Sequence, residues 1–126
     1  MALRLQYVVF ILLVLNSLPG AKAQAPLVDS LESRLVKLQD DTAKVNLLND
    51  MVAQYQHTNP DRAMFLANQA TALAKRINFP FGLGAAYRLT GILYVNKSSL
   101  DTGAMYYNKS FELFKNSSDA RSYKFK

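Results

Sequence analysis

Very few side chains in this 126-residue chain are of a type that carries out catalysis or binds metal. His57 is the only histidine, and the absence of cysteine excludes thiolate metal sites, cysteine nucleophiles and disulfides. A single histidine beside a predicted turn leaves little from which to build a metal site or a catalytic triad. The adjacent carboxylates Asp40 and Asp41 precede a predicted helix, where helix capping explains them. We therefore expect no enzymatic activity, no cofactor and no bound metal.

The glycines and serines do not change this expectation. Gly82 and Gly84 lack the continuation of a phosphate-binding loop, and no serine lies in a nucleophile elbow. A small enzyme or metal protein is the alternative, and it predicts that replacement of His57 abolishes the activity.

The composition is that of one domain with a mildly basic surface. Half of the residues are apolar, which is enough for a packed core. The formal charge is +6, and without Arg4 and Lys22 of the N-terminal leader, 13 basic and 9 acidic residues remain. These charges are scattered, whereas a nucleic-acid-binding surface needs clustered basic residues. We expect no nucleic-acid partner.

The N-terminus has the pattern of a secretory signal peptide. Arg4 precedes an apolar run at residues 7–15. The small residues Ala21 and Ala23 occupy the two positions that a signal peptidase recognises for cleavage before Gln24. The pattern predicts a signal peptide at residues 1–23, and a mature protein that is periplasmic or secreted and not bound to a membrane. The run is too short to cross ~30 Å of hydrocarbon comfortably. The alternative is a leader that stays uncleaved and tethers the chain to the membrane.

Hydrophobic periodicity predicts an all-α chain after the leader. Pro19 and Gly20 are expected to interrupt any helix, and residues 24–26 to form a short linker. One stripe of leucines marks the first helix of the mature chain, within residues 24–42: Leu27, Leu31, Leu35 and Leu38.

Four further helices are predicted, at residues 43–56, 60–76, 81–95 and 100–115. Asn59 is expected to cap the helix at residues 60–76, with Pro60 at its first position. Asn78 is expected to end this helix in a left-handed conformation. The third contains glycines, each of which lowers helix propensity by roughly 1 kcal/mol. We interpret these glycines, and the alanines of the helix before, as sites where helices approach closely.

The four helices form two similar pairs. In the first helix of each pair, Leu48, Val52 and Tyr55 correspond to Tyr87, Gly91 and Tyr94 at an offset of 39 residues. In the second helix, Ala63, Ala67 and Ala70 correspond to Gly103, Tyr107 and Ser110 at an offset of 40 residues. A period in this range indicates a helical solenoid, in which each pair buries its second apolar face by stacking on its neighbour.

Residues 87–113 resemble a tetratricopeptide repeat (TPR). The family pattern has an aromatic, a Leu-Gly pair and a tyrosine in the first helix, then a small residue, an aromatic and a small residue in the second. The matching residues are Tyr87, Thr90, Gly91, Tyr94, Gly103, Tyr107 and Ser110. Thr90, Ser98 and Lys115 depart from the usual leucine, turn glycine and proline. Residues 43–77 match as a more divergent repeat.

The resemblance implies a right-handed α-solenoid of antiparallel helix pairs, with about five helices after the signal peptide. It divides the chain into a degenerate repeat at residues 43–79, a second repeat at 80–116 and the start of a truncated further helix at 117–126. The leader and the two repeats also resemble the exported N-terminal sensor regions of bacterial signalling proteins. This similarity implies a protein or peptide partner and a sensory or scaffolding role.

In TPR proteins the first helix of each repeat lines a concave groove. Carried over by position, the expected groove residues are Asn46, Asn49, Ala53, Gln56 and His57, then Ala85, Arg88, Ile92, Val95 and Asn96. Their amides and guanidinium would hydrogen-bond an extended or helical peptide. The outer face of the last helix, with Phe111 and Phe114, is expected to be under-covered. Either the chain is a truncated member of its family, or it covers this face by forming a homodimer.

Overall fold

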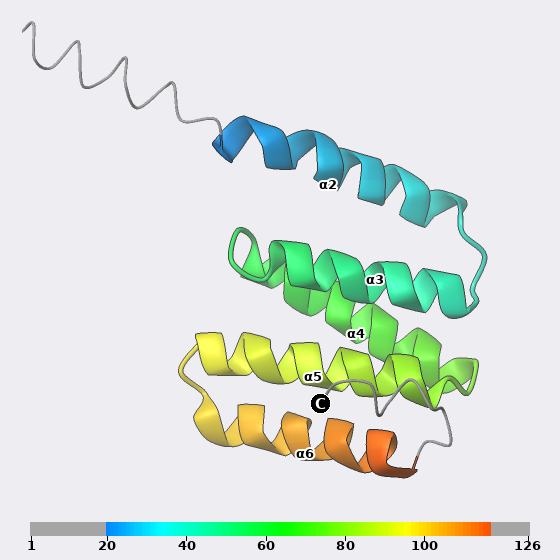
Figure 1. The fold of residues 1–126 in the computed structure, drawn as a ribbon, viewed down its shortest axis with the longest axis vertical. Coiled ribbons are helices and arrows are strands. Elements are labelled where there is room, and N and C mark those ends of the chain that lie inside the picture. The colour runs from blue at the N-terminus through cyan, green and yellow to red at the C-terminus, as the bar shows by residue number, and fades with distance from the viewer. Residues whose placement is uncertain (1–19, 117–126) are drawn as a thin grey trace, which may run out of the picture. The chain divides into compact units, whose positions relative to one another are not determined.

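The computed structural model describes residues 20–116, and the regular elements in this part of the chain are all α-helices (Figure 1). They are α2 (Gly20–Lys37), α3 (Thr42–Tyr55), α4 (Pro60–Arg76), α5 (Pro80–Asn96) and α6 (Leu100–Asn116). The ends of α3 to α6 agree with the predicted ranges to within one residue, which confirms the all-α prediction for the described residues. The chain forms two compact units, residues 1–30 and residues 31–126, and their boundary falls within α2.

The first described helix begins earlier than the sequence predicts. Gly20–Lys37 is one continuous helix, so the prediction of a linker at residues 24–26 is wrong. Every second residue before Pro26 is alanine, at positions 21, 23 and 25, and alanine is the strongest helix former. Pro26 removes one backbone hydrogen bond, but this loss does not necessarily end a helix. The expected cleavage site before Gln24 therefore lies within α2. The rest of the expected signal peptide, residues 1–19, and the predicted further helix at 117–126 lie outside the described residues.

Local capping explains where the later helices begin and end. Asp41 and Asn59 cap α3 and α4, each accepting a hydrogen bond from a backbone N–H at 3.1 Å. Pro60 follows at the first position of α4, as predicted. Asn78 has a φ of 53°, which confirms the predicted left-handed end of α4. Ser98 has a φ of 62° after α5, a conformation that favours glycine.

Helices α3, α4 and α5 share one apolar core, which also receives the C-terminal part of α2 that belongs to the same unit. The buried apolar residues are Val45, Leu47, Leu48, Met51, Val52, Ala63, Leu66, Ala67, Ala70, Leu73, Ala74, Ala86, Leu89 and Leu93. Leu31, Leu35 and Leu38 pack against this core, whereas Leu27 is 49% exposed, so the predicted leucine stripe is confirmed only in part.

Helices α5 and α6 approach closely at glycine residues. A Cβ added to Gly103 would lie 2.6 Å from Val95 Cγ2 and 3.1 Å from the carbonyl oxygen of Gly91. Further along, Ser110 Oγ donates a hydrogen bond of 2.7 Å to the carbonyl oxygen of Gly84. The interpretation of these glycines as close-contact sites is confirmed.

The described helices make a repeat-like fold. Helices α3 and α4 are joined by a four-residue turn, α5 and α6 by a three-residue turn, and α4 and α6 both have 17 residues. Within the second unit, α5 packs against both helices of the preceding pair (Figure 1). Stacking of this kind buries the apolar face that a single pair would leave open.

Candidate functional site

The predicted binding residues of α3 lie in three different environments. Asn46 and His57 are exposed, and Ala53 and Gln56 are half-buried. Asn49 is buried, with only 7% of its surface exposed. Gln56 and His57 follow the last residue of α3, so they border its C-terminal end.

Asn49 connects α3 to α5. Its Nδ2 donates a hydrogen bond of 3.1 Å to the carbonyl oxygen of Gly82, in the first turn of α5. Its Oδ1 is buried and has no hydrogen-bond partner among the described residues. One of its two amide N–H groups is thus bonded to Gly82, and little of the side chain is exposed to a ligand. The structure therefore gives Asn49 a structural role in place of the groove-ligand role that we predicted.

The predicted residues of α5 divide between two sides of the helix. Ala85, Ile92 and Asn96 are spaced by seven and four residues, which places them on one side. Arg88 is exposed next to them. Val95 instead contacts α6, since its Cγ2 lies 2.6 Å from the position of a Cβ on Gly103. Val95 therefore belongs to the α5–α6 contact and not to the predicted groove.

The remaining predicted residues come from two neighbouring helices. Helices α3 and α5 contact each other, and the offset of 39 residues relates Asn46 and Ala53 to Ala85 and Ile92. Ala53 and Ile92 both pack against the core while keeping part of their surface exposed. We call this set the α3–α5 surface; its members are Asn46, Ala53, Gln56, His57, Ala85, Arg88, Ile92 and Asn96.

Two further features, a cluster of metal-ligating side chains and a membrane-spanning helix, are absent from the described residues. Within residues 20–116, no three histidine or carboxylate side chains lie close enough together to hold a metal ion. No helix in the same part of the chain has the length and apolar character needed to cross a membrane.

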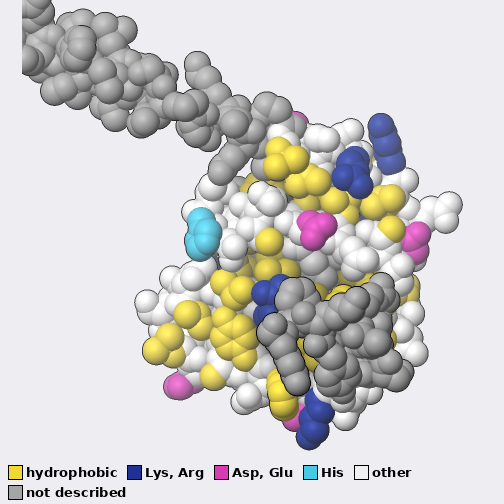
Figure 2. All heavy atoms as spheres, in the orientation of Figure 1, with side chains coloured by type: hydrophobic (Ala, Val, Ile, Leu, Met, Phe, Trp, Pro, Cys, Tyr) yellow, Lys and Arg dark blue, Asp and Glu magenta, His cyan; other side chains and the backbone are white. Residues whose placement is uncertain are grey.

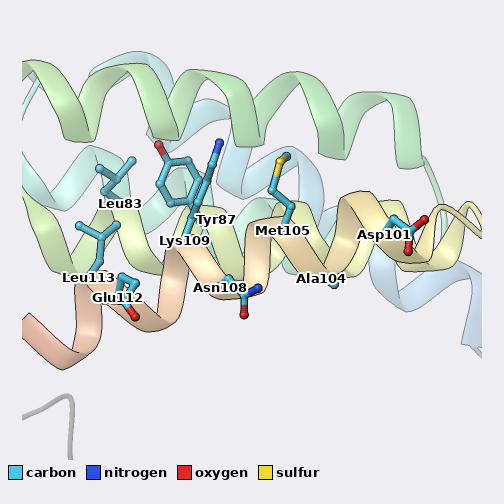
Figure 3. Close-up of a pocket in the computed structure, with 9 residues that line it drawn as sticks. All are labelled: Leu83, Tyr87, Asp101, Ala104, Met105, Asn108, Lys109, Glu112 and Leu113. Carbon is cyan, nitrogen blue, oxygen red and sulfur yellow. The ribbon is translucent and has the colours of Figure 1, made fainter.

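A groove over α5 and α6 was not predicted from the sequence. It has a volume of about 800 Å³ and is lined by Leu83, Tyr87, Asp101, Ala104, Met105, Asn108, Lys109, Glu112 and Leu113 (Figure 3). Met105, Lys109 and Leu113 recur every four residues, so the sequence shows that they share one side of a helix. The sequence does not show that Leu83 and Tyr87 of α5 lie beside these residues. Figure 3 shows that they do.

Two residues of this groove, Tyr87 and Lys109, belong to a cluster of tyrosine rings and lysine side chains. The rings of Tyr94 and Tyr106 are stacked with their centroids 5.5 Å apart, and Tyr87 lies 5.8 Å from Tyr106. Lys109 Nζ lies 5.1 Å from the centroid of Tyr106, and Lys75 of α4 lies 5.8 Å from that of Tyr87. Because these contacts join three helices, we assign the tyrosines to packing between helices.

A half-buried ion pair joins α2 to the first helix pair within the second unit. Arg62 Nη2 donates to both carboxylate oxygens of Glu32 at 2.9 Å. Tyr55 donates its hydroxyl hydrogen to Glu32 Oε1 at 3.1 Å. The side chains of Arg62 and Glu32 are 34% and 31% exposed, so water screens their attraction only in part.

Asp40 forms an exposed ion pair in the turn between α2 and α3. Lys44 Nζ donates to Asp40 Oδ1 at 2.8 Å, and Arg76 donates to the other carboxylate oxygen. The hydrogen bond from Lys44, with the charges of Lys44 and Arg76, holds the pKa of Asp40 below its ordinary value of 3.8.

No protein-family model, no curated protein and no solved structure matches this chain. The TPR resemblance therefore stays a prediction that depends on the motif residues and their spacing.

Proposed function

We propose that this chain is an exported TPR-type module that binds a peptide segment of a protein partner on the α3–α5 surface. One observation carries the proposal. The two helix pairs are similar, and their first helices, α3 and α5, contact each other, so equivalent residues come from neighbouring helices. Such a surface suits recognition of a polypeptide, and we assign no catalytic step to it.

The chemistry of the α3–α5 surface favours a peptide with a short apolar side chain and accessible main-chain groups. Ala53 and Ile92 supply an apolar floor that is half-buried before any ligand binds. Asn46, Asn96 and Arg88 are exposed around it. An asparagine amide both donates and accepts hydrogen bonds, as a peptide backbone does, and the guanidinium of Arg88 favours a carboxylate on the ligand.

The leader supports an extracytoplasmic site of action. The resemblance to exported sensor regions supports a sensory or scaffolding role in signal transduction. The alternative is a module that its uncleaved leader holds at the membrane. Mass spectrometry of the N-terminus of the expressed protein separates the two. A chain that begins at Gln24 supports release, and a chain that keeps Met1 supports the tether.

Peptide display tests the binding proposal. Peptides selected on the immobilised protein from a random library are labelled, and their binding is measured by fluorescence anisotropy. The test variant carries Ala53→Glu and Ile92→Glu, which place charges on the apolar floor. The matched control carries Ala72→Glu and Asn116→Glu, at exposed positions of the second helices α4 and α6. Far-UV circular dichroism checks that both variants remain folded.

The test variant should bind the selected peptides at least about tenfold more weakly, a loss of about 1.4 kcal/mol. The control should bind them as the unmodified protein does. Equal binding by the two variants would show that the peptides bind elsewhere, and the proposal would then be wrong.

A further inference from the structure

The groove over α5 and α6, which we call the α5–α6 groove, has features that the rest of the exposed apolar surface lacks. Apolar side chains reach the surface in several places (Figure 2), so exposure alone does not identify a docking site. This groove is concave, with a volume of about 800 Å³. Tyr87 and Lys109 lie in its middle and Asp101 at one end (Figure 3). Met105 lies between them and is 44% exposed.

The groove lies on the opposite side of α5 from the α3–α5 surface. Leu83 and Tyr87 line the groove, whereas Ala85 and Ile92 belong to the α3–α5 surface. An α-helix turns by about 100° per residue, so these two pairs of residues lie about 140–180° apart around the axis of α5. A ligand in the groove therefore leaves the side chains of the α3–α5 surface free.

The walls of the groove favour a helix as its occupant. The lining residues of α6 extend from Asp101 to Leu113, which is about three turns or ~18 Å of helix. Both walls are α-helices, whose backbone N–H and C=O groups are bonded internally, so the groove offers no sheet edge to an extended strand. An amphipathic helix satisfies its own main-chain hydrogen bonds and places apolar side chains in such a groove.

Two lysines favour an acidic residue on that helix. Lys75 Nζ of α4 and Lys109 Nζ of α6 lie 5.8 and 5.7 Å from the centroid of the Tyr87 ring. Neither ammonium group forms an ion pair with a carboxylate of residues 20–116. Asp101 and Glu112 also line the groove, but Asp101 lies at its end and Glu112 points away from the ring in Figure 3. A ligand that excludes water from the two lysines strengthens their attraction for a carboxylate.

We propose that the α5–α6 groove binds an amphipathic helix of a second protein partner. The apolar side of this helix covers Tyr87 and Met105. A carboxylate at the border of that side binds the ammonium groups of Lys75 and Lys109. The module then holds two polypeptides at once, on opposite sides of α5, as a scaffold does. The groove shares no residue with the α3–α5 surface, so either proposal can fail without the other.

A second exposed apolar residue of α6 supplies a matched control. Phe111 is 63% exposed, as the sequence predicts, and it does not line the groove. The prediction that Phe114 is exposed beside it is wrong. Phe114 is half-buried, because its ring lies 5.6 Å from that of Phe81 and against Gly84 of α5.

Selection of displayed peptides on the full-length protein tests the proposal. The peptides form helices with leucines at positions i, i+4 and i+7, and the positions that border this stripe vary among glutamate, lysine and glutamine. One selection uses the unmodified protein, and a second uses the variant with Lys75→Glu and Lys109→Glu. A third uses the variant with Ala53→Glu and Ile92→Glu, which alters only the α3–α5 surface. Far-UV circular dichroism checks that every variant is folded.

On the unmodified protein, glutamate should outnumber lysine by at least about tenfold at one bordering position. The variant with Lys75→Glu and Lys109→Glu should reverse this preference, and the α3–α5 variant should keep it. The same preference on the unmodified protein and the lysine variant would overturn the proposal, and so would a failure to select any peptide. If the α3–α5 variant alone lost the peptides, they would bind at that surface and the groove proposal would be wrong.

Fluorescence anisotropy with the selected peptides separates the groove from other apolar surface. Met105→Glu, in the groove, should weaken binding at least about tenfold. Phe111→Glu, on the same helix but outside the groove, should leave binding unchanged. Equal losses in the two variants would contradict the proposal. Displacement of the peptides by phosphatidylglycerol vesicles would assign the groove to an anionic membrane surface and would overturn the proposal as well.

Discussion

Gly103 lies at the closest approach of α5 and α6, and its replacement by alanine tests whether this contact sets the distance between them. The added Cβ would lie 2.6 Å from Val95 Cγ2 and 3.1 Å from the carbonyl oxygen of Gly91. The first contact is too short to persist, and the second is with backbone, which moves only if the helices separate. Gly103→Ala should therefore strain the pair although alanine favours a helix.

Two opposing free energies decide the net effect of Gly103→Ala. Alanine improves helix propensity over glycine by about 1 kcal/mol. Overpacking a close contact costs typically about 1–3 kcal/mol. Val95 is β-branched, and such a side chain has one strongly preferred rotamer in a helix, so it cannot turn away freely. We expect the substitution to lower the free energy of unfolding by about 1 kcal/mol, as the difference between these effects.

Urea unfolding, followed by circular dichroism at 222 nm, measures this change. The same substitution is also made in a Val95→Ala background, where the shorter contact disappears and only the contact with the Gly91 carbonyl remains. In that background Gly103→Ala should be neutral or stabilising. The two single variants and the double variant should give a coupling free energy of about 1–2 kcal/mol. Ala104→Gly, at an exposed neighbour, should cost about 1 kcal/mol through propensity alone.

The reasoning would be refuted if Gly103→Ala stabilised the protein by about 1 kcal/mol in both backgrounds. That result would mean that α5 and α6 accommodate the extra carbon without strain. The glycines would then not be needed for close packing of this helix pair.

Three further predictions concern the turns and ion pairs. Ser98→Gly should stabilise the protein by about 0.5–1 kcal/mol in urea unfolding, because glycine adopts the left-handed conformation without the cost that serine bears. Glu32→Gln should cost about 1 kcal/mol, because it removes the charge from the half-buried pair with Arg62; Asp29→Asn, at an exposed position of the same helix, should change stability little. The pKa of Asp40 is lower in the folded chain than in the unfolded chain, so the ionised carboxylate stabilises the fold at pH values above the unfolded-state pKa. This stabilisation is lost as the pH falls through the folded-state pKa, which lies below the ordinary value of 3.8. Asp40→Asn should therefore make stability less dependent on pH below about pH 4, as measured by unfolding at a series of pH values.

The sequence was sufficient for the helices and most of their ends because local interactions decide them. The period of apolar residues placed α3 to α6 to within one residue. Asn59, Pro60 and Asn78 act within one turn of their own position, so their roles could be predicted from neighbours alone. The linker at residues 24–26 was predicted wrongly because the alanines around Pro26 favour helix, and the prediction gave the proline more weight than those alanines.

The binding surface was predictable only in part. Repeat spacing placed Asn46, Ala53 and Ile92 on the first helix of each pair, where the structure also has them. The same spacing assigned Asn49 to the groove. In the structure its amide donates a hydrogen bond to the carbonyl oxygen of Gly82, 33 residues away. No local pattern distinguishes a ligand-binding asparagine from one that ties two helices together.

The sequence by itself determined which segments are helical, which sides of the helices are apolar and that the helix pairs repeat, because these properties depend on residues within a few turns of one another. Only the tertiary structure decided which partners those sides meet. The bond from Arg62 to Glu32, the closeness of Gly91 to Gly103 and the groove beside Tyr87 all join residues of different helices. Such contacts depend on how helices pack in three dimensions, and that packing selects among many arrangements that the same local pattern allows.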